Sequence, residues 1–159
     1  MYKTILCASD LGDNAQIVLS KAAELAQATG AHVHLLHVLE LPWRADPWFT
    51  PYIQQDVDFF LNLAQRQQEA AKTQLENLWK NVSSSTTHGK PIACEYIIRE
   101  GVPADTIIAA SQETQSDMIV MGTHGRHGLS HFLLGSVAER VVRTATCCVL
   151  TIRTPTQHA

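Results

Sequence analysis

The segment from Gly122 to Ser136 contains the residue types that bind a phosphate group. It begins Gly-Thr-His-Gly-Arg-His-Gly, with three glycines in seven positions. Glycines let backbone amides approach a ligand closely, because no Cβ is in the way. Gly135 and Ser136 then open a helical pattern, whose free N–H groups and dipole favour an anion. A phosphate site is one interpretation; the other is that the glycines only form turns and that Ser136 and Glu139 make a capping box.

The best-known nucleotide motifs are absent from this segment, which has neither the GxxxxGK[ST] nor the GxGxxG spacing. Its histidines, at positions 124, 127 and 131, are spaced three and four apart, as the ligands on one face of a metal-binding helix would be. The intervening Gly125 and Gly128 indicate a loop instead. We therefore expect no metal site built from these side chains.

Alternating strand and helix patterns must position the glycine-rich segment. Strands are expected over residues 3–9, 32–39, 92–98, 117–121 and 147–152, and helices over residues 13–29, 53–82, 104–115 and 135–144. The strands are apolar runs, which indicates an α/β protein with a parallel sheet covered by helices on both faces. Ligands of such sheets bind beyond the carboxyl ends of the strands, where the strand order reverses. The segments after the first, second and fourth strands are therefore the expected site.

The remaining segments are expected to be connections within a single domain. Residues 41–51 hold three prolines and two tryptophans, and we expect a loop in which Trp43 and Trp48 cover the core or an interface. Residues 83–89 are polar and are expected to form a flexible linker. Residues 154–159 are a tail. His32 and His34 alternate with apolar residues, so we expect them on one side of a strand, half-buried or exposed.

The overall composition excludes several classes of function. Among 159 residues, 12 Lys and Arg stand against 15 Asp and Glu, so no basic field favours nucleic acid or an anionic membrane surface. No apolar run approaches the ~20 residues of a membrane span, and no signal peptide is evident. The four cysteines lie in or near apolar segments without a CxxC pair, and we expect them to be buried, reduced thiols of a cytoplasmic protein.

The glycine spacing and the strands around it resemble the universal stress protein family, and within it the subfamily that binds ATP. The family signature is glycine, two residues, glycine, nine residues, then glycine followed by Ser or Thr, and it is met by Gly122, Gly125, Gly135 and Ser136. Further similar segments are residues 2–10, 37–38, 117–122 and 148–152. The resemblance implies one domain over residues 1–159, with an open, twisted, five-stranded, Rossmann-like parallel sheet. The expected strand order is 3-2-1-4-5, as in the adenine nucleotide alpha hydrolases.

The resemblance also implies a role for each site residue. Ala8 and Ser9 would line the base and sugar, Asp10 would lie beside the ribose and the metal-bound phosphates, and the main chain of Val38 would contact adenine. Mg²⁺ or Mn²⁺ would be held mainly by the phosphates of ATP. For Asp10 the alternative is a cap on the first helix, and for Arg126 a solvated side chain rather than a phosphate contact. The complete expected nucleotide site is Ala8, Ser9, Asp10, Val38, Met121, Gly122, Thr123, His124, Gly125, Arg126, His127, Gly135, Ser136 and Val137.

The expected function is that of an ATP-binding regulatory or stress-response protein with little or no ATP turnover. There is no Walker-type lysine, and the loop offers no carboxylate to orient an attacking water. Asp10 and His124 are the only candidate catalytic groups, and both are better explained as ligand contacts. The alternatives are a slow ATPase or nucleotide switch, and a dimeric interaction module that binds AMP or cyclic AMP. No protein partner is indicated by the sequence.

The last strand is expected to form a homodimer. Its residues are apolar and β-prone, which makes an exposed edge if it is unpaired. The family resemblance implies that two such strands pair antiparallel across a two-fold axis, and Ile152→Pro is expected to shift the dimer toward monomer. The predicted interface is Val149, Leu150, Thr151, Ile152 and Arg153.

Overall fold

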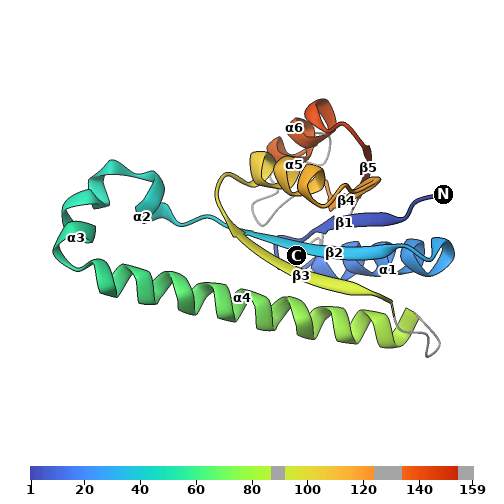
Figure 1. The fold of residues 1–159 in the computed structure, drawn as a ribbon, viewed down its shortest axis with the longest axis horizontal. Helices are drawn as coiled ribbons and strands as arrows, with labels where there is room; N and C mark the ends of the chain where they lie inside the picture. Colours follow the sequence, from blue (N-terminus) through green and yellow to red (C-terminus); the bar gives the residue numbers. More distant parts are fainter. Residues whose placement is uncertain (87–91, 124–133, 154–159) are drawn as a thin grey trace, which may run out of the picture.

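The computed structural model describes residues 1–86, 92–123 and 134–153. They form one five-stranded sheet with all neighbours parallel and the order β3-β2-β1-β4-β5 (Figure 1). The expected fold class and strand order are therefore confirmed. The strands are β1 (Thr4–Ala8), β2 (His32–Leu39), β3 (Cys94–Glu100), β4 (Met118–Gly122) and β5 (Cys148–Ile152).

Two pairs of helices cover the two faces of the sheet (Figure 1). The helices α1 (Ala15–Thr29) and α4 (Val57–Thr86) pack on one face, and α5 (Pro103–Glu113) and α6 (Ser136–Thr144) on the other. Alternate residues of each strand enter the two cores: Ile5 of β1 faces α1 and α4, whereas Leu6 faces α5 and α6. Burial on both faces explains why the central strands β1 and β4 are almost entirely apolar.

Two glycines occupy backbone conformations that other residues rarely adopt. Gly30 ends α1 with a φ of 73°, and its N–H donates to the Ala26 carbonyl, as its place in the sequence predicts. Gly101 follows β3 with a φ of 146°, and its N–H donates to the Leu39 carbonyl at 3.1 Å. A Cβ at Gly101 would lie 2.6 Å from Thr106 Oγ1. This second turn holds the end of β2 against the end of β3.

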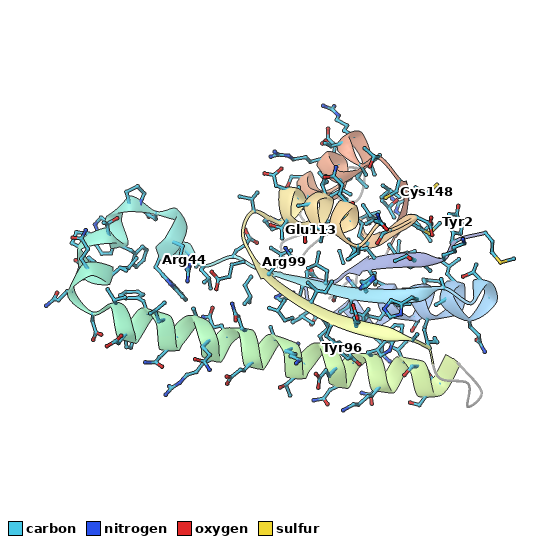
Figure 2. All side chains as sticks on the ribbon, in the orientation of Figure 1. Tyr2, Arg44, Tyr96, Arg99, Glu113 and Cys148 are labelled. Carbon is cyan, nitrogen blue, oxygen red and sulfur yellow. The ribbon has the colours of Figure 1, made fainter. Side chains whose placement is uncertain are left out.

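An ion pair connects the same end of β3 to the helix layer above it. Nη2 of Arg99 lies 2.5 Å from Oε2 of Glu113 in α5, and Nη1 approaches the second carboxylate oxygen at 3.3 Å. Figure 2 shows the two side chains converging from β3 and α5. A paired guanidinium contact of this kind gives orientation as well as attraction.

The prediction of a loop over residues 41–51 is wrong, because most of that segment is helical. It forms α2 (Pro42–Ala45), the 3₁₀ helix η1 (Pro47–Phe49) and the start of α3 (Thr50–Gln55), at the end of the molecule farthest from β5 (Figure 1). Each proline lies in the first turn of its helix, where proline is tolerated. The ring of Trp43 lies 6.0 Å from that of Phe60, but Trp48 is 65% exposed and does not cover the core.

The prediction of a flexible linker over residues 83–89 is also wrong for its first four residues, which continue α4 to Thr86. Ser83 and Ser85 donate from their hydroxyls to carbonyls three residues earlier in the same helix. Such bonds let serine remain in a helix although it favours turns elsewhere. Positions 87–89 and the expected tail over 154–159 lie outside the described residues.

The expectation of buried thiols holds only in part. All four cysteines are free; Cys7 is buried, Cys94 and Cys147 are half-buried, and Cys148 is exposed. Burial raises the pKa of Cys7 well above its usual range and that of Cys94 to about 12. Edge position explains the exposure of Cys148, which is the first residue of β5. Within the three described ranges, no helix combines the length and apolar character needed to cross a membrane.

Candidate functional site

The carboxyl end of β1 turns sharply into the segment that precedes α1. The N–H of Ser9 donates to the Leu36 carbonyl at 2.9 Å, which extends the contact between β1 and β2 by one residue. The Ser9 hydroxyl accepts from the N–H of Leu11 at 3.2 Å, and Leu11 has a φ of 58°. The serine side chain thus supports a left-handed turn directly beyond the strand.

Asp10 is part of this turn and does not cap α1. Its Oδ1 accepts from the N–H of Gly12 at 3.0 Å, an arrangement typical of an Asx turn. The N-cap of α1 is Asn14, so the alternative that Asp10 caps the first helix is wrong. Asp10 therefore lies at the tip of β1, at the edge of the sheet where the site is expected.

The buried side chain of His37 ties β2 to the same turn. Its Nδ1 lies 2.8 Å from the carbonyl oxygen of Ser9. Because a carbonyl oxygen can only accept, Nδ1 must carry the proton and donate. His37 is not among the site residues expected from the sequence; the available signal is a histidine near the carboxyl end of β2, among apolar neighbours. The contact holds the backbone of the β1 turn in place beside β2.

The main chain of Val38 is directed past the end of β1. The N–H of His32 and the carbonyl of Leu36 both bond toward β1, so alternate residues of β2, Val38 among them, turn their main-chain groups to that side. The ladder between the two strands ends where Ala8 pairs with Leu36. The N–H and C=O of Val38 therefore point into the space beyond Ala8, which suits a main-chain contact with a planar base.

The end of β4 is held to the start of α6. The N–H of Thr123 donates to the Ile152 carbonyl at 3.0 Å, and the N–H of Gly135 donates to the Thr123 carbonyl at 2.8 Å. Residues 124–133, between these two anchor points, are outside the described ranges. The two anchors place the N-terminus of α6 at the carboxyl edge of the sheet, beside the ends of β4 and β5.

Gly135 is the N-cap of α6, and its carbonyl accepts from the N–H of Glu139 at 2.8 Å. The alternative of a capping box formed by Ser136 and Glu139 is therefore wrong, since Ser136 is already the first helical residue and no side chain of the described residues caps the helix. Gly135 has a φ of −60° and a ψ of 152°, which any residue can adopt. A glycine at this position adds no side chain beside the first N–H groups of α6, which is an arrangement that suits an anion.

The described members of the expected site all follow or end a strand at one edge, or begin α6. Met121 and Ala8 are buried, so their contribution to a ligand would come from the main chain. Among the described residues, Ser136 is exposed and offers a hydroxyl directly at the helix N-terminus. The members at positions 124–127, namely His124, Gly125, Arg126 and His127, lie outside the described ranges.

Sequence comparisons identify the family. The model of the universal stress protein family matches residues 1–153. The chain belongs to the universal stress protein family. One relative, universal stress protein MJ0531 of Methanocaldococcus jannaschii, is 31% identical over 156 residues, covering 98% of this chain and 84% of the relative. Another, universal stress protein A homolog 1 of Coxiella burnetii, is 32% identical over 152 residues, covering 95% of this chain and 96% of the relative.

Solved structures show the same architecture. Hypothetical protein MJ0577, also from Methanocaldococcus jannaschii, superposes with a TM-score of 0.79 at 28% identity, over 99% of both chains. A universal stress protein in complex with cAMP superposes with a TM-score of 0.63 at 20% identity, over 96% of this chain and 97% of the other. A universal stress protein from Archaeoglobus fulgidus in complex with dAMP gives 0.57 at 22%, over 94% and 97%. The last two similarities establish the fold alone.

Proposed function

We propose that this protein binds ATP at the carboxyl edge of its sheet. The observation that supports this most directly is the N-terminus of α6, which has no side-chain cap among the described residues and which the hydrogen bond from Gly135 to Thr123 holds beside the end of β4. Free N–H groups and the helix dipole suit a phosphate chain there. The outward-directed main chain of Val38 suits the base, and the turn of Ser9 and Asp10 lies between the two.

The metal would belong to the nucleotide more than to the protein. Mg²⁺ or Mn²⁺ prefers oxygen ligands, and the phosphates of ATP supply them. Among the described residues of the expected site, Asp10 is the one that has a carboxylate side chain. Its Oδ1 already accepts a hydrogen bond from the N–H of Gly12. We therefore assign Asp10 to the ribose and the metal-bound phosphate side, with no catalytic role. Slow or absent turnover follows, and the protein would act as a cytoplasmic regulatory or stress-response protein whose folded state ATP stabilises by mass action.

We also propose that the protein forms a homodimer through β5. This strand is at the edge of the sheet, next to β4 only. The N–H of Cys148 and the carbonyl of Ile152 bond toward β4, so the main-chain groups of Val149, Thr151 and Arg153 face outward. An antiparallel partner strand would bond to the outward groups of Val149 and Thr151.

Because the main-chain groups of β5 face β4 and the outside in turn, Ile152→Pro is not the best test of the dimer. Ile152→Pro would remove an N–H that faces β4 and would damage the sheet itself. Thr151→Pro removes an outward N–H and leaves the bonds to β4 in place, as prolines on edge strands do. We expect Thr151→Pro to be monomeric by light scattering, with a circular dichroism spectrum like that of the parent. A variant that stays dimeric would exclude β5 as the interface.

The first experiment on ligand identity is to purify the protein without added nucleotide, denature it, and identify any released nucleotide by chromatography and mass spectrometry. Stoichiometric ATP is the expected result, and it would also show that turnover is slow. If no nucleotide is released, the purified protein is titrated with ATP in the presence of Mg²⁺. An empty protein that does not take up added ATP would contradict the proposal and leave a dimeric interaction module.

A second candidate ligand is AMP or cyclic AMP, because proteins of this fold hold cAMP and dAMP. Competition separates the two possibilities. If the N-terminus of α6 binds the outer phosphates, ATP displaces a fluorescent adenine nucleotide at a lower concentration than AMP or cyclic AMP does. Equal or reversed potency would favour the monophosphates. Steady-state release of phosphate from ATP, measured on the same preparation, tests the slow-ATPase alternative.

A further inference from the structure

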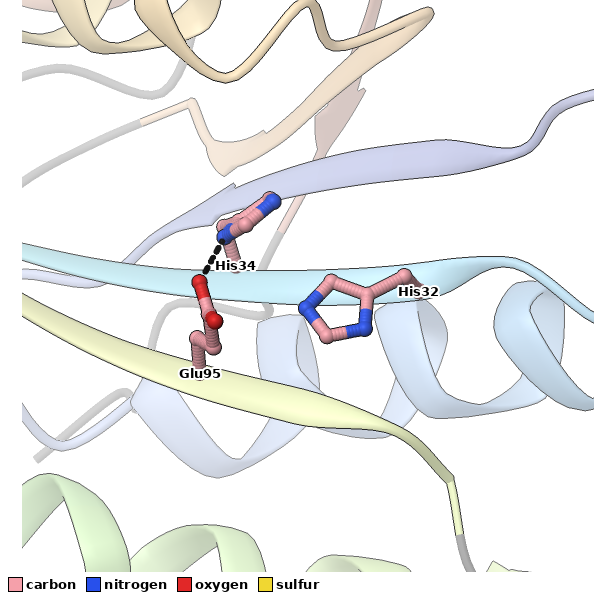
Figure 3. A group of neighbouring side chains, drawn as sticks. All are labelled: His32, His34 and Glu95. Atoms are coloured by element: carbon pink, nitrogen blue, oxygen red, sulfur yellow. Dashed lines mark ion pairs between the residues drawn. The ribbon is translucent and has the colours of Figure 1, made fainter.

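A second group of ligand-bearing side chains lies at the opposite, amino end of the sheet (Figure 3). His32 and His34 project from the same face of β2, because successive side chains of a strand alternate. Glu95 of β3 stands directly opposite His34 in the strand register. One ligand atom from each of the three side chains lies within 4.8 Å of the others. None of the three belongs to the expected nucleotide site.

His34 has a buried nitrogen whose hydrogen-bonding capacity is unused. The side chain of His34 is 13% exposed, and its Nδ1 lies 3.1 Å from Oε2 of Glu95. The direction of this contact does not meet hydrogen-bond geometry, and within the described part of the chain Nδ1 has no hydrogen-bond partner. Buried polar atoms without partners are uncommon in folded proteins. A cation between the imidazole and the carboxylate would satisfy both groups.

We propose that His32, His34 and Glu95 form a binding site for Zn²⁺. Two imidazoles and one carboxylate are a ligand set that zinc accepts, with water in the fourth position. Magnesium and calcium prefer all-oxygen ligands, so the site differs in chemistry from the phosphate-bound cation proposed for ATP.

The geometry requires only a modest closure around the ion. Zinc–ligand bonds of about 2.0–2.1 Å place tetrahedral ligands about 3.4 Å apart. The His34 and Glu95 atoms, at 3.1 Å, are already close to that separation. The remaining movement falls to His32, which is the first residue of β2, and to Glu95, whose side chain is 66% exposed. Both can rotate without disturbing the core.

A bound zinc ion would clamp the edge strand β3 to its neighbour β2. The same two strands are held at their carboxyl ends by the Gly101 turn, so the ion would secure the other end of the pair. Zinc binding to the folded state alone would raise the melting temperature.

The test uses full-length, tag-free protein treated with EDTA and then titrated with ZnCl₂, by calorimetry or against a colorimetric zinc indicator. We expect saturation at one Zn²⁺ per chain with a dissociation constant below about 10 μM, undisturbed by millimolar Mg²⁺. Glu95→Gln and His32→Gln should each weaken binding at least about tenfold. The matched control is Glu24→Gln, which removes an exposed carboxylate of α1 and should leave the affinity unchanged. Melting temperatures without zinc verify that each variant is folded.

A competing location is the set of histidines at positions 124, 127 and 131. Replacing all three by Asn should leave the stoichiometry and affinity for Zn²⁺ unchanged. The visible spectrum of bound Co²⁺, used in place of zinc, should persist in that variant and disappear in Glu95→Gln. The proposal is wrong if wild-type protein shows no saturable binding, or if the triple variant loses binding while Glu95→Gln retains it.

Discussion

The two ends of the sheet are built from different parts of the polypeptide. At the carboxyl end, the groups that the proposal assigns to the nucleotide are mostly main-chain atoms: the amide and carbonyl of Val38 and the first N–H groups of α6. At the amino end, the side chains of His32, His34 and Glu95 converge on one point. A main-chain site depends on small residues and strand ends, whereas a side-chain site depends on register.

This difference determines how each site can be disturbed. Bulk added at a glycine should damage the carboxyl end, where backbone access matters. Removal of a single ligand atom, with no change in bulk, should damage the amino end. Variants of each kind can therefore test whether the two ends are independent sites.

The largest expected effect is that of Gly135→Val on ATP binding. Gly135 has an ordinary φ, so valine fits the backbone while its side chain crowds the N-terminus of α6. We expect a loss of at least about 100-fold in affinity, or about 2.7 kcal/mol, with only a small fall in melting temperature, because valine is a poorer N-cap than glycine. Gly135→Ala should lose less. Calorimetry with Mg²⁺ and ATP measures both, and a Val variant that binds like the parent would remove α6 from the site.

A smaller effect is expected for His37→Leu, which leaves the buried Ser9 carbonyl without its donor. We expect a loss of about 1–3 kcal/mol in the free energy of unfolding, measured by urea denaturation. His37→Asn is the matched control, because its amide nitrogen can replace Nδ1 as a donor, and it should lose less stability. If the two variants are equally unstable, the loss comes from packing and not from the bond to Ser9.

Measuring both ligands, Zn²⁺ and ATP, on one variant from each end of the sheet compares the two ends directly. Glu95→Gln should weaken Zn²⁺ binding about tenfold, or about 1.4 kcal/mol, and leave ATP affinity within about twofold. Gly135→Val should show the opposite pattern. If one variant impairs both ligands after its fold has been verified, the two ends are coupled and the comparison fails.

The smallest expected effect is a pH dependence at the amino end. Burial and, to a smaller extent, neighbouring His32 lower the pKa of His34 in the folded state, and Glu95 opposes them. The stabilising contribution of neutral His34 is therefore present above the unfolded-state pKa of about 6.5 and is lost as pH falls through the folded-state pKa. Zinc-free protein should melt at a lower temperature at about pH 5.5 than at about pH 7.5, and the difference should shrink in His34→Gln. An identical difference in the variant would assign the effect to other groups.

Much of the fold was predictable because its pattern is local. Apolar strand runs, the Gly30 helix stop and the alternation of strands with helices each follow from neighbouring residues. The errors occurred where local preference was overridden. Serines 83–85 remained helical through side-chain bonds within α4, and the prolines of residues 41–51 began short helices.

For the candidate nucleotide site, the sequence predicts a set of positions but not the contacts between them. Glycine spacing and the ends of strands are visible in one dimension, and the structure places their described members at one edge. The alternatives in which Asp10 and Ser136 cap helices are wrong, because a cap depends on the residue at which the helix begins. The role of His37 was missed, because its partner Ser9 lies in the turn after a different strand.

By itself, the sequence determined the α/β pattern, the family and the glycine signature, since these depend on residue type and spacing along the chain. Only the tertiary structure decided which distant groups meet. His32 and His34 share a face by strand periodicity, but Glu95 reaches them through the register of β2 with β3. The outward direction of Thr151 likewise follows from the pairing of β5 with β4. Register is set by the packing of the whole sheet, which no short segment encodes.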